Sequence, residues 1–237
     1  MAFFQACNKS SNNVKETKNE LELISSEKIN VSEASGLAIN TSGSTLYTVS
    51  DNTGNISESR ISGQIDAMNV AYSNNNTNIS FILDSINRVE NDDWFSGWSS
   101  DTEGLDGEGM QALSFDPAHY LNIYSVELWN SGSGGFVTYG YTYSPHTNNY
   151  PEDHYRQGFT IDHKVVYGGS SYSSSTAPHE AGHYLGLYHT FQTDCVTPDD
   201  AVDDTPRNDS EYVQTCSNQD TCPNDPGNDP VENYMNY

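Results

Sequence analysis

Residues 179–189 read His-Glu-Ala-Gly-His-Tyr-Leu-Gly-Leu-Tyr-His, which is the pattern HExxHxxGxxH. On a helix, His179 and His183 lie four residues apart, so both imidazoles leave one face, one turn apart. Gly186 lets the helix stop and the chain turn sharply, because glycine reaches positive φ at little cost. The turn returns His189 as a third ligand. Three protein ligands leave one zinc position open, which is typical of a catalytic site.

Glu180 follows the first of these histidines and is placed to take a proton from water on the metal. Two core histidines four residues apart would be an ordinary alternative. The full pattern, however, arises by chance in fewer than about one in ten thousand sequences of this length. We therefore interpret His179, His183 and His189 as zinc ligands and Glu180 as a general base.

The end of the chain carries a second motif, Asn-Tyr-Met-Asn-Tyr at residues 233–237. In proteases with the long histidine pattern, a methionine in a turn forms an apolar floor under the ligands. A flexible thioether fills such an irregular space well. We predict that Met235 has this place, where an ordinary turn with a core methionine is the alternative.

Together these motifs resemble the pappalysin-type metzincins, including their bacterial secreted members. The resemblance covers about residues 55 to 237 and continues through HTFQTDC (189–195), AVDDTP (201–206) and CPNDPGNDP (222–230). It implies a secreted zinc endopeptidase that hydrolyses peptide bonds of extracellular proteins. The alternative is a non-catalytic zinc-binding fragment that recognises or adheres to extracellular polypeptide. Glu180 favours the enzyme, because a binding protein needs no base.

The resemblance also implies further residue roles. It pairs Cys195 with Cys222, and it places a calcium ion in the acidic loop formed by Asp199, Asp200, Asp203, Asp204 and Thr205. A solvated acidic loop is the alternative there. The hydroxyl of Tyr237 would donate a hydrogen bond to the oxyanion formed during attack. Otherwise this tyrosine only packs beside Tyr234.

Two cysteines have no assigned partner. The family normally continues past the methionine turn into another cysteine and a helix, so we expect a catalytic domain truncated after that turn. Four cysteines allow three connectivities, and a Cys7–Cys216 bond is among them. Cys7 itself has three interpretations: a lipid-anchor site, a thiolate that caps zinc in a latent zymogen, or a free cysteine in a tail.

Composition limits partners and location. The 237 residues include 33 acidic and 9 basic side chains, a formal net charge of −24. Such a surface repels nucleic acid and anionic membrane, so neither is an expected partner. No stretch approaches the ~18 apolar residues of a membrane-spanning helix. We expect a secreted or extracellular protein, with a cell-surface lipoprotein as a variant. The sequence does not determine the oligomeric state.

The expected fold class is α/β (α+β), with a twisted mixed sheet, an active-site helix and a loop-rich lower subdomain. A flexible segment or tether, 1–30, precedes a catalytic domain, 31–237, whose upper and lower subdomains span about 44–186 and 187–237. A helix should follow Ser57, with Ile61, Ile65, Met68 and Tyr72 in the core. Strands are predicted at 44–51, 79–86, 120–128, 136–143 and 160–167.

Overall fold

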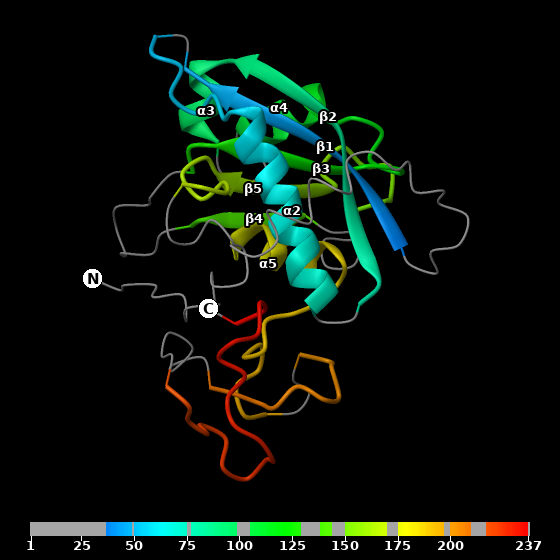
Figure 1. The fold of residues 1–237 in the computed structure, drawn as a ribbon, viewed down its shortest axis with the longest axis vertical. Helices are drawn as coiled ribbons and strands as arrows, with labels where there is room; N and C mark the ends of the chain where they lie inside the picture. Colours follow the sequence, from blue (N-terminus) through cyan, green and yellow to red (C-terminus); the bar gives the residue numbers. More distant parts are fainter. Residues whose placement is uncertain are drawn as a thin grey trace, which may run out of the picture.

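Five strands form one mixed sheet in the order β2-β1-β3-β5-β4 (Figure 1). β1, β2, β3 and β5 run parallel, whereas β4 pairs antiparallel with β5 and forms one end of the sheet. The strand bounds are Leu37–Tyr47 (β1), Ile79–Glu90 (β2), Leu121–Val126 (β3), Gly140–Tyr143 (β4) and Gly158–Asp162 (β5). The sheet is mixed, as the sequence predicts.

The computed structural model describes residues 37–48, 50–74, 77–98, 105–128, 138–143, 150–169, 175–196, 200–209 and 217–236. The predicted N-terminal segment therefore lies outside the described residues, and so do Cys7, Asp199, Cys216 and Tyr237. No helix in the described part of the chain has the length and apolar character needed to span a bilayer.

Helix α2 (Glu58–Asn74) crosses one face of the sheet in Figure 1. The Ser57 carbonyl accepts the first helical N–H groups, so the helix begins where the sequence predicts. Of the four residues predicted for its core face, Ile65, Met68 and Tyr72 are buried, and Ile61 is partly buried against the same cluster. The same core cluster contains Ala177 and Ala181 of the active-site helix, so this face of the sheet carries both helices.

The opposite face is covered by two short helices, α3 (Asp92–Gly97) and α4 (Leu105–Leu113). They bury Phe95 and Met110 in a second core cluster. The Asn91 side chain caps α3 by accepting the Trp94 N–H at 2.9 Å. The strand and helix patterns in the sequence did not predict these helices, since both are short and rich in acidic residues and glycine.

Several strand boundaries differ from prediction. β1 spans 37–47, whereas 44–51 was expected, because Asp51 turns the chain by accepting bonds from Thr48 and Thr53. β5 spans 158–162, whereas 160–167 was expected. There the Asp162 carboxylate accepts the N–H groups of Leu128 and Lys164, which draws the chain out of the sheet. β2 continues to Glu90, four residues beyond prediction.

A buried ion pair lies against the face of β4 that points away from the active-site helix. Asp106 of α4 is fully buried and lies 3.3 Å from Arg156. It also accepts hydrogen bonds from the hydroxyls of Tyr143, at 3.0 Å, and Tyr141, at 3.3 Å. Burial raises the pKa of Asp106, while the Tyr143 bond and the charge of Arg156 lower it. The charged pair is therefore held in the core by hydrogen bonds.

Removing this carboxylate should be costly. We expect Asp106→Ala to lower the free energy of unfolding by about 3–5 kcal/mol, because Arg156 stays buried without its counter-ion. Urea denaturation measures the change. The matched control is Glu127→Ala, which breaks the exposed Glu127–Lys164 bridge and should have little effect. Similar small losses in the two variants would contradict the structural role of Asp106.

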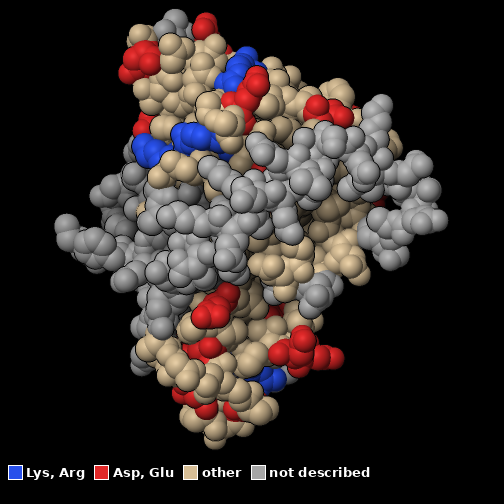
Figure 2. Space-filling model, in the orientation of Figure 1, with Lys and Arg blue, Asp and Glu red and all other residues tan. Residues whose placement is uncertain are grey.

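The lower part of the molecule is built from turns. Between 187 and 236, the described residues form no helix or strand. A disulfide joins Cys195 to Cys222, with a Cα–Cα distance of 5.5 Å, as the family resemblance implied. Arg207 is the only Lys or Arg from 187 to 237, and the charged side chains visible in this region in Figure 2 are mainly acidic. The exact subdomain boundary remains a prediction.

Candidate metal centre

The predicted ligands begin on helix α5 (Thr176–Tyr184). Its first turn is closed by the His179 N–H, which donates to the Ser175 carbonyl at 3.0 Å. The helix ends at Tyr184, Leu185 is its C-cap, and Gly186 follows with a φ of +96°. There the N–H of Gly186 donates to the His183 carbonyl and that of Leu187 to the Gly182 carbonyl. This Schellman geometry requires left-handed backbone, which explains the glycine in the motif.

The turn after Gly186 brings the three histidines together. The Nε2 atoms lie 3.0 Å apart for His179 and His183, 3.1 Å for His183 and His189, and 3.3 Å for His179 and His189. Their ligand atoms form a candidate metal group among the described residues. In a tetrahedral zinc site with Zn–N bonds of about 2.0–2.1 Å, nitrogens would be about 3.3–3.4 Å apart. The observed triangle fits that size.

The other ring nitrogens fix the proton positions. His179 Nδ1 lies 2.6 Å from the Tyr234 carbonyl, and His183 Nδ1 lies 2.8 Å from the Leu187 carbonyl. A carbonyl only accepts, so both Nδ1 atoms carry protons. In a neutral ring Nε2 then has a lone pair. Those lone pairs repel one another unless a cation lies between them, so the donor set suits zinc.

Burial favours the neutral form of two of these rings. It lowers the pKa of His183. Burial and the neighbouring His183 lower the pKa of His189 to about 4. Zinc binds the neutral imidazole, so a low pKa reduces competition by protons at neutral pH.

Glu180 points from the same helix toward the edge of the sheet. Its side chain is buried, and Oε2 accepts a hydrogen bond from the Thr142 hydroxyl at 2.6 Å. Burial raises the pKa of Glu180 to about 8, whereas the Thr142 bond lowers it. A nearby cation would favour the ionised form. The site therefore combines three convergent nitrogens with one buried carboxyl group.

The methionine turn lies against the helix. Met235 is buried, and its carbonyl accepts the N–H of Thr190, next to the third ligand. The helix residue it meets is Gly182, where a Cβ atom would lie only 2.4 Å from Met235 Sδ. Met235 therefore packs against the helix that carries two of the predicted ligands, and the glycine makes room for it.

Comparisons with known proteins place this geometry in a family. The family model of peptidase M43, described as pregnancy-associated plasma protein-A, matches residues 104–237, which include the three histidines, Glu180 and Met235. The chain belongs to peptidase family M43. Its members are metallopeptidases, so the pappalysin-type resemblance seen in the sequence is confirmed.

Individual relatives agree with this family assignment. An extracellular metalloprotease of Arthroderma benhamiae is 34% identical over 229 residues, covering 94% of this chain and 78% of the relative. One from Podospora anserina is 33% identical over 187 residues, covering 78% of this chain. The matched region spans 60% of that relative's length. The names of these relatives agree with the predicted extracellular location.

A solved structure shares the fold. Mature mirolysin of Tannerella forsythia, determined in complex with a cleaved peptide, superposes with a TM-score of 0.66 at 22% identity. The match covers 86% of this chain and 84% of mirolysin. At this identity the likeness concerns the fold, and it confirms the predicted metzincin architecture.

The contact between helix and methionine turn leads to a prediction for this family M43 chain. Alanine usually stabilises a helix relative to glycine. Here we expect the reverse: Gly182→Ala should lower the free energy of unfolding by about 1–3 kcal/mol, because it overpacks Met235. Thermal and urea denaturation measure the loss. Met235→Ala should cost less in the Gly182→Ala background than in the wild type. Equal costs in both backgrounds would show that the two residues do not interact.

Other predicted site residues are not brought together in this way. Asp200 is buried and its carboxylate accepts the Val202 N–H, whereas Asp203 and Asp204 are exposed. Among the described residues, these carboxylates do not converge as the three histidines do. Calcium binding at Asp199–Thr205 therefore stays a prediction. The predicted roles of Tyr237 and Cys7 also stay predictions, since both residues lie outside the described ranges.

The structure adds two site residues that sequence reasoning missed. Thr142 and Gly140 contact Glu180 from strand β4, 38 and 40 positions earlier in the chain. The segment containing them was predicted to form a strand. Nothing in its local pattern, however, indicates which element its side chains meet.

Proposed function

We propose that this chain is a secreted zinc-dependent endopeptidase that cleaves peptide bonds of extracellular proteins. The observation that carries this proposal is the convergence of three half-buried imidazoles, with their Nε2 atoms 3.0–3.3 Å apart, beside the buried carboxyl group of Glu180. Three nitrogen ligands leave a position open for a reactant. The names of the extracellular relatives support secretion and proteolysis.

His179, His183 and His189 would hold the zinc. When bound, zinc lowers the pKa of a coordinated water and polarises a carbonyl group. Glu180 then acts as the proton carrier: its carboxylate accepts the proton of the attacking water and later delivers it to the leaving amine. Its burial suits both steps, because a desolvated carboxyl group holds a proton more readily than an exposed one.

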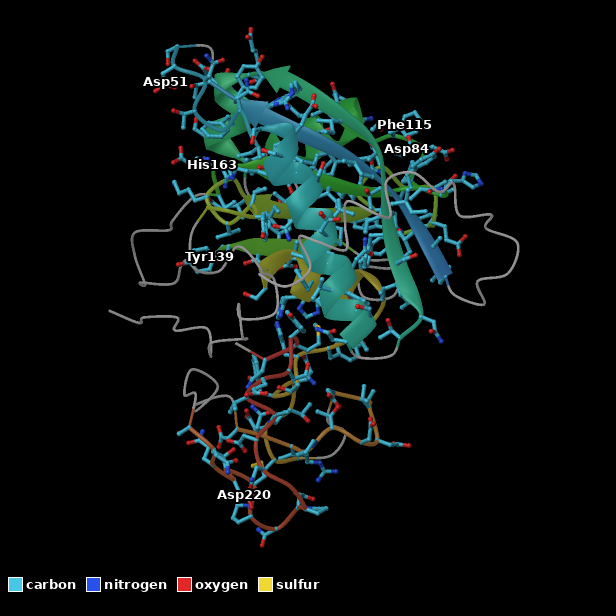
Figure 3. The ribbon with its side chains drawn as sticks, viewed as in Figure 1. Asp51, Asp84, Phe115, Tyr139, His163 and Asp220 are labelled. Carbon is cyan, nitrogen blue, oxygen red and sulfur yellow. A yellow bond between two sulfur atoms is a disulfide. The ribbon has the colours of Figure 1, made fainter. Side chains whose placement is uncertain are left out.

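Strand β4 offers a place for an extended polypeptide. It is the last strand of the sheet, and it pairs only with β5 among the described strands. Figure 3 labels Tyr139, which lies directly before β4, and it shows Asp220 in the lower part of the molecule, far from this strand. Thr142 of β4 contacts Glu180, so the edge of the sheet that β4 forms lies beside the catalytic carboxyl group. An extended substrate can add to such an edge through main-chain hydrogen bonds.

Casein cleavage tests the proposed function. The wild-type protein should cleave casein, 1,10-phenanthroline should stop the reaction, and added zinc should restore it. Elemental analysis of the same sample should find one zinc per chain. A protein that binds zinc but leaves casein and other unfolded polypeptides intact would instead be the non-catalytic binding fragment.

We also propose a structural calcium ion in the acidic loop that contains Asp200, Asp203 and Asp204. Its support is the family resemblance, together with the buried Asp200 carboxylate and the lack of regular secondary structure in the described part of this region. Carboxylates only a few residues apart in the sequence repel one another, and a bound cation would relieve that repulsion. EGTA should lower the unfolding temperature, and calcium should restore it. An unfolding temperature indifferent to both additions would remove the calcium proposal.

A further inference from the structure

Two residues of β4 form a seat for the Glu180 side chain. Gly140 and Thr142 are two positions apart on a strand, so they face the same side of the sheet. That side carries α5. The seat is therefore made by an edge strand and not by the helix that bears Glu180.

Gly140 provides the room. A Cβ atom at this position would lie 2.7 Å from Glu180 Oε1 and 2.9 Å from its Cγ. Real Cβ atoms do not approach that closely, so any other residue would displace either the carboxyl group or the strand. The glycine thus lets the carboxyl group rest directly against the backbone of β4.

Thr142 provides the direction. Its hydroxyl lies 2.6 Å from Glu180 Oε2 and 2.9 Å from the Glu180 carbonyl. Threonine is branched at Cβ, so its χ1 angle is restricted and the hydroxyl is held in place. A charge-assisted bond to a carboxylate is stronger than one to a carbonyl. The hydroxyl therefore orients the carboxylate oxygens.

The strand itself is fixed from its other face. Tyr141 and Tyr143, which alternate with Gly140 and Thr142, donate hydrogen bonds to the buried Asp106. The arginine that pairs with Asp106 also lies over the Tyr143 ring, 5.1 Å from its centroid. β4 is thus held between a buried ionic network on one side and Glu180 on the other.

We propose that Gly140 and Thr142 are positioning residues that hold the Glu180 carboxylate in the orientation needed for proton transfer. The proposal rests on the proposed peptidase function. It also links binding to chemistry, because β4, which pairs only with β5 among the described strands, is the proposed place for an extended substrate. β4 would then hold both the substrate and Glu180, and so fix the position of one relative to the other.

Thr142→Val tests the hydroxyl. It keeps the size and branching of threonine but removes the hydrogen bond to Glu180. We expect kcat to fall by about 10- to 100-fold, the range for outer partners of a catalytic site, with KM and zinc content unchanged. Thr142→Ser, which keeps the hydroxyl, should restore most of kcat.

The matched control is Thr41→Val. Thr41 is a fully buried threonine of β1 whose hydroxyl donates to the Ile82 carbonyl at 3.0 Å. Its substitution should lower stability without changing kcat. A purely structural role for Thr142 predicts the same behaviour in both variants: a lower unfolding temperature and an unchanged kcat. That outcome would overturn the proposal.

Gly140→Ala tests the seat independently. It should lower kcat because the new methyl group displaces the carboxyl group, while Gly43→Ala should not. Gly43 is also a strand glycine, but its Cβ would meet only the Ser85 carbonyl oxygen at 3.8 Å, an ordinary contact. Equal kcat values for the two alanine variants would count against the seat.

Two further measurements separate positioning from other effects. Crystal structures of Thr142→Val and of the wild type should show the Glu180 carboxyl group rotated in the variant. In a Glu180→Gln background, Thr142→Val should cause little further loss, because residues that act together are not additive. An unmoved carboxyl group or fully additive losses would overturn the proposal. A wild-type protein without zinc-dependent cleavage would instead overturn the proposed function itself.

Discussion

Glu180→Gln should bind zinc as the wild type does and lose at least about 100-fold in kcat, the lower range for loss of a general base. Glu180 is not among the convergent ligand atoms, so its replacement removes no metal ligand. Glutamine has nearly the same shape, and its amide oxygen can still accept the Thr142 hydrogen bond. An amide, however, can neither take up nor deliver a proton at neutral pH. The fold and metal should persist while the chemistry stops.

The measurement combines metal content, thermal unfolding and steady-state kinetics on one purified sample. Glu127→Gln is the control, since Glu127 is an exposed carboxylate paired with Lys164. It should keep full activity. A zinc-loaded Glu180→Gln protein with wild-type kcat would refute the role of Glu180 as the base and leave the zinc site intact.

His189→Ala should have the second large effect, through the metal and not through the proton. His189 Nε2 completes the triangle with His179 and His183, so its loss leaves two ligands. We expect zinc affinity to fall by more than about 100-fold, beyond the range for outer partners, and proteolysis to be lost with it. Competition with a fluorescent zinc chelator measures the affinity, and casein cleavage measures the activity.

The control for this variant is another histidine. His119 is 73% exposed and pairs with Asp116 at 2.9 Å, so His119→Ala should leave both zinc affinity and activity unchanged. A His189→Ala protein with wild-type zinc affinity would show that the third ligand comes from elsewhere. Together with Glu180→Gln, the variant separates an enzyme that has lost its metal from one that has lost its base.

Local rules explain why the ligand set could be predicted. The spacing of His179 and His183 follows from 3.6 residues per helical turn, and Gly186 follows from the left-handed backbone that ends the helix. Both features belong to one stretch of eleven residues. The core stripe of α2 is equally local, which is why Ile65, Met68 and Tyr72 lie in the core as predicted.

Strand limits were harder to predict for a physical reason. The last residue of β1 depends on the Asp51 turn. The last residue of β5 depends on Asp162, which binds the N–H groups of Leu128, after β3, and Lys164, after β5. Side chains that bond backbone groups compete with the sheet ladder. The alternation of apolar and polar residues, from which strands are predicted, carries no information about that competition.

The sequence by itself predicted the family, the convergence of the three histidines and the carboxyl group beside them, because these depend on residues close together on one helix and its turn. Only the tertiary structure decided how the carboxyl group and the histidine rings are held. Thr142 reaches Glu180 across 38 residues, and the Tyr234 carbonyl reaches His179 across 55. Such contacts form when separate elements pack, and no periodicity along the chain encodes their partners. The tuning of the candidate site is therefore a property of the packed sheet, helix and methionine turn together.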